Sequence, residues 1–278
     1  MRGLKYILLF FTVCLQAQIT IKGKLNDADK KEPIPFASIG SMQNNAAVMS
    51  DEKGVFNLIL KTAEPTDTIK FYAIGYKELL VPIKELKLDG VNNLTLVQGS
   101  FDLEEVEVNA KKIFTKKIGV TKYDKSNCSG FIDIGNNWKG VETAIRLSNS
   151  DNKLLKVKDF SFYIIKNTLP DSLTFRLNFY SANKFYPTRN ILKKSIIFKT
   201  AVKQGEVTLD LSSYTISAYS DFYVGLECLM EKVSISDFCF SGSNPEPSYV
   251  RESAFNKWKK IRGGGAAFNV TVLYSKKY

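Results

Sequence analysis

Apolar and polar side chains alternate in short runs along most of the chain, which is typical of β-strands. Residues 19–25 are apolar at every second position apart from Gly23, so one face of this run is expected to be buried. Further strand-like runs cover residues 36–42, 55–60, 68–74, 94–97 and 106–108. This spacing of about seven strands over the first hundred residues predicts a small β-sandwich.

The second half continues with longer apolar runs that are separated by Gly, Pro, Asn and Asp turn signals. Strand-like runs cover residues 156–165, 173–180, 195–198, 206–211, 221–229, 233–239 and 267–273. Residues 139–147 have a weak helical pattern and could form a short helix. We therefore expect an all-β protein of two β-sandwich domains, with a jelly-roll-like sandwich over residues 126–278.

Four short motifs stand in order in the first half: PFASI at 35–39, SDEKGVFNL at 50–58, IGYK at 74–77 and LEEVEV at 103–108. Asp51 and Gly54 of the second motif suit a tight turn. The series resembles the carboxypeptidase regulatory-like domain, a transthyretin-like β-sandwich of Bacteroidetes type. This resemblance implies a seven-strand sandwich over residues 19–110 that supports assembly or protein contact and has no peptidase activity.

The N-terminus carries a secretion signal by its pattern. Arg2 and Lys5 precede an apolar run at residues 6–15, so residues 1–18 are predicted to be a cleaved signal peptide. The run of about ten residues is shorter than the roughly 20 needed to span a bilayer. Lipidation of Cys14 stays an alternative, although Val13 stands where a lipoprotein signal requires a small residue. We predict an extracytoplasmic protein (periplasmic, outer-membrane associated or secreted) that is peripheral to a membrane at most.

Charge narrows the class of partner. The formal net charge is +11, and lysines crowd residues 111–125, which we predict to be a linker or an exposed edge. A basic extracytoplasmic protein can contact acidic polysaccharides, lipid head groups or cell-wall polymers. The expected partner is an envelope protein or a polysaccharide, and the signal peptide argues against nucleic acid.

The residue inventory limits the chemistry. The chain has no histidine, which excludes Ser-His-Asp catalysis and histidine-ligated metals. After signal cleavage three cysteines remain; Cys228 and Cys239 lie on neighbouring predicted strands and are a candidate pair, unless all three thiols are simply buried. We expect no cofactor, no metal site and no catalytic residue. A hydrolase with two carboxylates stays open as an alternative, because such acids need not be close in sequence.

Aromatic residues near predicted strand ends are the candidate binding surface. Sugar rings stack on aromatic side chains while Arg and Asn bind their hydroxyl groups. The candidate ligand-binding residues are Trp258, Arg251, Tyr249, Trp138 and Tyr186. The alternative is that these rings pack inside the sandwich, as is common for aromatic residues at sheet ends. The sequence thus favours a non-enzymatic interaction or scaffold module, with a carbohydrate-binding accessory protein as the alternative.

Overall fold

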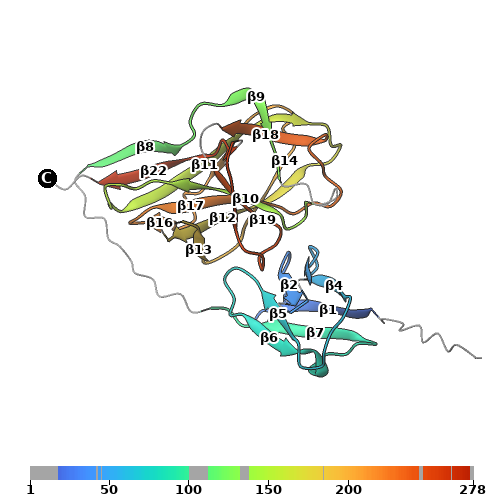
Figure 1. Ribbon diagram of the computed structural model, residues 1–278. Coiled ribbons are helices and arrows are strands. Elements are labelled where there is room, and N and C mark those ends of the chain that lie inside the picture. Colours follow the sequence, from blue (N-terminus) through green and yellow to red (C-terminus); the bar gives the residue numbers. More distant parts are fainter. Residues whose placement is uncertain are drawn as a thin grey trace, which may run out of the picture.

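The computed structural model describes residues 18–41, 43–44, 46–99, 112–131, 138–183, 185–243, 247–263 and 265–275. Within these residues the chain forms 22 strands and one short 3-10 helix, η1 (Ile83–Glu85), and no α-helix. The predicted all-β class is confirmed. Two sheets are built from strands of residues 19–96 and two from strands of residues 113–275, so the described residues form two sandwich-like units (Figure 1). No helix of the described ranges has the length and apolar character to cross a membrane.

The first unit has seven strands in two sheets. One sheet has the order β4 (Val55–Leu60), β1 (Ile19–Asp27), β7 (Val91–Leu96), and the other has the order β3 (Ala46–Met49), β2 (Ser38–Ser41), β5 (Thr68–Tyr72), β6 (Leu79–Pro82). The alternation of β1 buries Ile21 and Leu25, and Phe56 of β4 packs edge-on against Phe71 of β5 at 5.6 Å between ring centroids. These contacts fill the space between the two sheets.

The second unit has two larger sheets. The first, which we call the charged-face sheet, has the order β13 (Pro187–Asn190), β12 (Leu173–Ala182), β17 (Phe222–Cys228), β10 (Glu142–Leu147), β19 (Ser248–Arg251), β20 (Lys259–Ile261), with β14 (Ile196–Thr200) also on β12. The second has the order β21 (Gly265–Ala266), β18 (Phe238–Ser243), β11 (Leu155–Asn167), β22 (Asn269–Ser275), β8 (Ile113–Gly119), with β9 (Asp124–Ser129), β15 (Gly205–Asp210) and β16 (Ser217–Ala218) attached. A phenylalanine-rich core, including Phe162, Phe175 and Phe268, lies between them.

One sequence expectation for this half differs from the structure. Residues 139–147 form no helix but lead into strand β10, whose two faces are both buried and so show no simple alternation. Residues 113–119, in the segment predicted to be a linker or an exposed edge, form the exposed edge strand β8, which pairs with β22 at one end of the second sheet. The predicted strand at 106–108 and the signal peptide with Cys14 lie outside the described residues.

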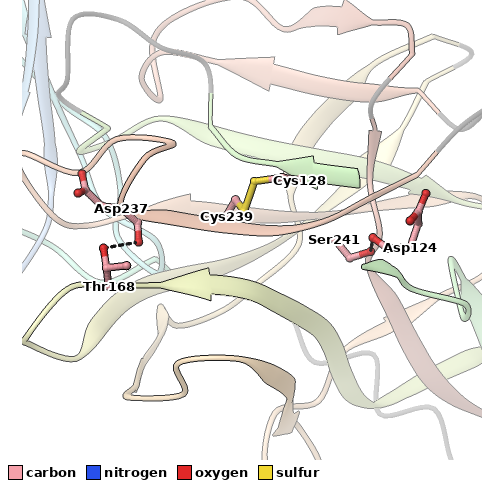
Figure 2. Close-up of a disulfide and its surroundings, with 6 residues drawn as sticks. All are labelled: Asp124, Cys128, Thr168, Asp237, Cys239 and Ser241. Atoms are coloured by element: carbon pink, nitrogen blue, oxygen red, sulfur yellow. Dashed lines mark hydrogen bonds between the residues drawn. A yellow bond between two sulfur atoms is a disulfide. The ribbon is translucent and has the colours of Figure 1, made fainter. Parts of the chain in front are cut away.

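A disulfide joins Cys128 of β9 to Cys239 of β18, with the two Cα atoms 5.6 Å apart and a sequence separation of 111. Figure 2 shows this bond, with the Ser241 hydroxyl donating a hydrogen bond to the Asp124 carbonyl at 2.9 Å on the same pair of strands. The suggested pairing of Cys228 with Cys239 is therefore wrong. Cys228 lies on β17 in the other sheet, where burial raises the pKa of its thiol to about 12.

The two units meet through close contacts. Gly75 of the first unit has φ +93°, and a Cβ atom there would lie 2.5 Å from the carbonyl oxygen of Lys193. A Cβ atom on Gly40 would lie 2.5 Å from the ring of Phe255, which comes from the second unit. Ile74 joins the core cluster of the second unit. The turn at residues 74–75 is therefore packed directly on the second unit.

Candidate functional site

A row of four charged side chains crosses the outer face of the charged-face sheet. Cross-strand register places Arg176 of β12 opposite Glu227 of β17, Glu227 opposite Glu142 of β10, and Glu142 opposite Arg251 of β19. The order along the row is thus positive, negative, negative, positive. We call this set, Arg176, Glu227, Glu142 and Arg251, the charge row.

Glu142 is the most heavily bonded member of the charge row. It is fully buried, and Arg251 donates to its Oε2 from Nε at 2.9 Å and from Nη2 at 2.6 Å. The Tyr180 hydroxyl and the Asn178 amide each lie 2.9 Å from its Oε1. A carboxylate that receives this many donors is held in one orientation.

The other half of the charge row ties the two units together. Glu227 is 2% exposed and accepts from Arg176 Nη1 and from Asn178 Nδ2, each at 3.2 Å. Arg176 Nη2 donates to the backbone carbonyl of Phe36 in the first unit. The guanidinium of Arg176 in the second unit therefore binds a backbone carbonyl of the first unit. Arg176 and Glu227 are both shielded from water there.

Burial dominates the electrostatics of this face. It raises the pKa of the Glu227 carboxyl above its usual value, and it raises the pKa of the Tyr180 hydroxyl well above its usual range. Burial also opposes the charge of Arg251, but the neighbouring Glu142, Tyr180 and Glu227 together outweigh it and raise the pKa of that guanidinium. Arg251 thus stays charged beside Glu142.

This arrangement is poorly suited to hydrolysis. The two carboxylates share one donor, Asn178 Nδ2, so they are close enough to resemble a catalytic pair. A glycosidase pair, however, flanks an open cleft that admits a sugar ring. Here each acid is buried and ion-paired to an arginine, at 2.6 Å for Glu142 and 3.2 Å for Glu227. The geometry is that of a buried charge network.

Four of the five predicted ligand-binding residues lie together at the Arg251 end of the charge row. They are Arg251 itself, Trp258, Tyr249 and Tyr186. The guanidinium carbon of Arg251 lies 4.5 Å from the centre of the Trp258 ring, and the Trp258 ring meets Tyr180 edge-on at 5.5 Å. Tyr249 is buried and meets Tyr186 edge-on at 5.9 Å. We call Tyr186, Tyr249 and Trp258, with Lys260 above Tyr249, the aromatic group.

Trp138 takes no part in the aromatic group. Its side chain is fully buried in the core and packs against Phe131, with 5.4 Å between ring centroids. The indole cannot serve as a platform for a ligand there. Sequence position near a strand end did not separate this core ring from the partly exposed Trp258.

Sequence reasoning missed four residues that organise the face: Glu142, Glu227, Arg176 and Asn178. The available signal was the polar residue at every second position of otherwise apolar strands, as in the RLNFY segment at 176–180. Such residues are normally assigned to a solvated face. In this protein that face is covered by the first unit, as the Arg176 contact with Phe36 shows.

Two cavities open between the units on either side of this contact, and the turn at residues 73–76 lines both. One, of about 420 Å³, has as its polar and charged lining Lys30, Tyr76, Gln98, Arg176, Lys193, Lys194 and Ser195. The other, of about 360 Å³, is lined by residues that include Lys70, Glu78, Tyr180, Arg189, Arg251 and Phe255. Among the described residues no group of three acidic or cysteine side chains could hold a metal ion.

The protein is thus a β-sandwich module joined to a second β-rich unit, with buried carboxylates where the two units meet. Residues 21–108 match the family model of the CarboxypepD_reg-like domain, which confirms the resemblance seen in the sequence. This domain family is a non-catalytic β-sandwich module. No curated protein matches the chain.

Solved structures give only distant likenesses. The cysteine protease and lectin-like domains of Cwp84, a surface layer associated protein of Clostridium difficile, are 10% identical with a TM-score of 0.39, covering 58% of this chain and 36% of that one. The infectious bursal disease virus Gt strain gives 8% identity and a TM-score of 0.25, covering 92% of this chain and 59% of that one. The chain thus spans about a third and three fifths of those proteins, and neither likeness bears on function.

Proposed function

We propose that the protein is an extracytoplasmic, non-enzymatic interaction module that contacts a partner of the cell envelope. The Cys128–Cys239 disulfide is the observation that carries the location. Disulfides form and persist in oxidising compartments and are rare in the cytosol. The signal-like sequence at residues 1–18 agrees with this location.

The burial and ion pairing of the two neighbouring carboxylates support a function without catalysis. Glu142 and Glu227 are the paired carboxylates of the second unit, and both are neutralised by arginine and shielded from solvent. The first unit belongs to a non-catalytic domain family. The protein is therefore proposed to act by binding.

The aromatic group is the proposed contact surface. Tyr186 is 40% exposed and stands beside Phe185, which is 61% exposed, between strands β12 and β13. Tyr249 is buried and supports Tyr186 and Lys260 from below, and the partly exposed Trp258 packs on the same aromatic cluster. Tyr, Trp and Arg are the residues that most often dominate binding energy at protein interfaces.

A photo-crosslinking experiment tests this proposal. A photoreactive amino acid replaces Tyr186 in the full chain in producing cells, and Val91, 59% exposed on the first unit, is the matched control position. We expect a discrete adduct with one envelope protein from position 186 and none from position 91. In the same cells, Cys128 and Cys239 are expected to resist alkylation until a reductant is added. An unspecific adduct pattern, or free thiols at both cysteines, would contradict the proposal.

Carbohydrate binding is the second candidate function. The observation that favours it is the half-buried Trp258 ring next to the guanidinium of Arg251, which together offer an apolar surface and hydrogen-bond donors. Glycan-array binding of the full chain would be compared with Trp258→Ala and with Tyr219→Ala, an exposed ring remote from the aromatic group in sequence. Glycan affinity that only Trp258→Ala abolishes, with folding intact, would replace the protein-contact proposal.

A further inference from the structure

We propose that the 420 Å³ cavity between the two units is a binding site for a small ligand that carries an oxyanion, namely a phosphate, sulfate or carboxylate group. Its volume is within the usual range of small-molecule sites. It also lies between two units, where such sites commonly occur. This inference goes beyond the proposed function, since it does not depend on a protein partner.

The charge of the lining selects for an anion. Lys30 comes from the first unit, whereas Lys193 and Lys194 come from the loop between β13 and β14 of the second. None of these three lysines forms an ion pair within the described part of the chain. No carboxylate of the described residues lines the cavity. All three are exposed at the edge of the cavity, and the Lys194 ammonium also lies 4.7 Å from the centre of the Tyr214 ring. Positive charge around a cavity whose lining has no carboxylate attracts an anionic ligand.

Two buried donors in the lining have no partner within the described residues. They are the Nε of Arg176 and the Oγ of Ser195. Arg176 is only 6% exposed, and its other two nitrogens are used by Glu227 and by the Phe36 carbonyl. Buried donors normally find acceptors, and one that stays unpaired is destabilising. An oxyanion in the cavity would supply acceptor oxygens to both.

The site is preformed rather than dependent on flexible side chains alone. Glu227 and Phe36 hold the Arg176 guanidinium from two sides. Gly75 brings the first unit against the carbonyl of Lys193, because a Cβ atom at this position would come within 2.5 Å of that oxygen. The Arg176 guanidinium and the wall formed by Gly75 are therefore in place before any ligand arrives, which lowers the entropic cost of binding.

Calorimetric titration of the full mature chain tests the site. The probes are inorganic phosphate, sulfate, glucuronate and neutral glucose, all at one ionic strength so that general screening is constant. The variants are Ser195→Ala, which removes a donor that has no protein partner, and Lys193→Gln combined with Lys194→Gln. Lys84→Gln combined with Lys87→Gln is the matched control, because it removes the same charge from exposed positions outside the cavity.

We expect saturable binding of at least one anionic probe and none of glucose. The Lys193/Lys194 variant should weaken it about tenfold or more. Ser195→Ala should weaken it about fivefold, the value of one hydrogen bond. The Lys84/Lys87 control should stay within about twofold of the wild type. Preference for glucuronate would identify an acidic sugar, and preference for phosphate a phosphorylated ligand or free phosphate.

Three results would overturn the inference. The first is no saturable binding of any anionic probe by the folded wild type. The second is an equal loss of affinity in the Lys84/Lys87 control, which would indicate a general charge effect. The third is glucose binding as tight as that of glucuronate. Because none of these readouts involves an envelope protein, failure here leaves the crosslinking result unaffected.

Discussion

The two faces of the charged-face sheet are both buried, but they are buried by opposite chemistry. On strand β12, Phe175, Leu177 and Phe179 face the core, while Arg176, Asn178 and Tyr180 face the first unit, and all six are at most 6% exposed. The inner face is held by apolar contact, which is non-directional. The outer face is held by hydrogen-bonded charge. Strand alternation here therefore separates two kinds of interior rather than inside from outside.

The difference has a consequence for how the two units meet. Apolar surfaces tolerate sliding, whereas a buried charge that loses its partner is strongly unfavourable. Arg176 must keep both Glu227 and the Phe36 carbonyl, so it specifies one position of the first unit on the sheet. The charge row thus selects the arrangement of the units while the phenylalanine core supplies the stability.

The largest expected effect is on the inner face. Phe175→Ala removes a fully buried ring that contacts Phe131, Phe162 and Phe238, and should lower the free energy of unfolding by about 3–5 kcal/mol. Denaturant unfolding of the purified chain measures this loss. Phe185→Ala, at an exposed ring, is the control and should change stability by less than about 0.5 kcal/mol. Equal losses would mean that the core does not carry the stability.

Breaking the outer face should cost slightly less. Arg176→Met leaves Glu227 buried without its ion-pair partner and should destabilise by about 3 kcal/mol. Removing both charges, with Arg176→Met and Glu227→Met together, should recover part of that loss, because no buried charge is then left unpaired. A double-mutant cycle in denaturant measures the coupling. A double variant as unstable as the sum of the singles would refute the pairing.

A steric test sharpens the comparison further. Gly225 lies on the outer face of β17, and a Cβ atom there would lie 2.3 Å from Glu142 Oε1. Gly225→Ala should displace this carboxylate and cost about 1–3 kcal/mol. Gly90→Ala is the matched control, since its Cβ atom would meet only the Lys87 side chain at 3.6 Å. Thermal unfolding of both variants decides the point, and equal melting temperatures would show that Glu142 can move freely.

The smallest effect concerns pH, where a third carboxylate behaves oppositely to Glu227. Asp27 accepts from the backbone N–H groups of Lys30 and Asp29 and from Gln98 and Tyr76, and these hydrogen bonds, foremost that of Lys30, lower its pKa. The stability that Asp27 contributes to the folded state is therefore complete above pH 3.8 and is lost as pH falls further. Burial instead raises the pKa of Glu227, so the stability that Glu227 contributes is lost as pH rises above 4.5. The stability difference between wild type and Asp27→Asn should shrink below about pH 4. A constant difference in melting temperature from pH 3 to 6 would contradict this.

Much of the fold of the first unit could be predicted from the local pattern of apolar and polar residues. Strand β1 alternates because only one of its faces is buried, and the turn at Asp51 ends where Gly54 takes a positive φ of 75°. The order of the four motifs then sufficed to identify the domain. Local pattern was informative there because each strand reports directly on a single sandwich core.

The second unit and its site were harder to predict for a physical reason. In β10, Glu142 and Thr143 are both buried, one under the first unit and the other towards the core, so no alternation of burial marks the strand. Arg251 and Trp258, two of the candidate ligand-binding residues, lie next to each other, but Glu142, the ion-pair partner of Arg251, is 109 residues away from it in sequence. The prediction of the cysteine pair failed for the same reason, since Cys128 lies 111 residues from Cys239. Long-range pairing is invisible to local spacing.

The position of β22 between β11 and β8 determines when the second unit can fold during synthesis. This strand, Asn269–Ser275, pairs with β11 on one side and with β8 on the other, so it joins segments made first and last. The sheet cannot close until these residues have left the ribosome, and β8 must wait unpaired for about 150 residues of further translation, at about 5–20 residues per second. The Cys128–Cys239 disulfide links two strands of this same sheet, so its two cysteines reach their final places only when the sheet closes.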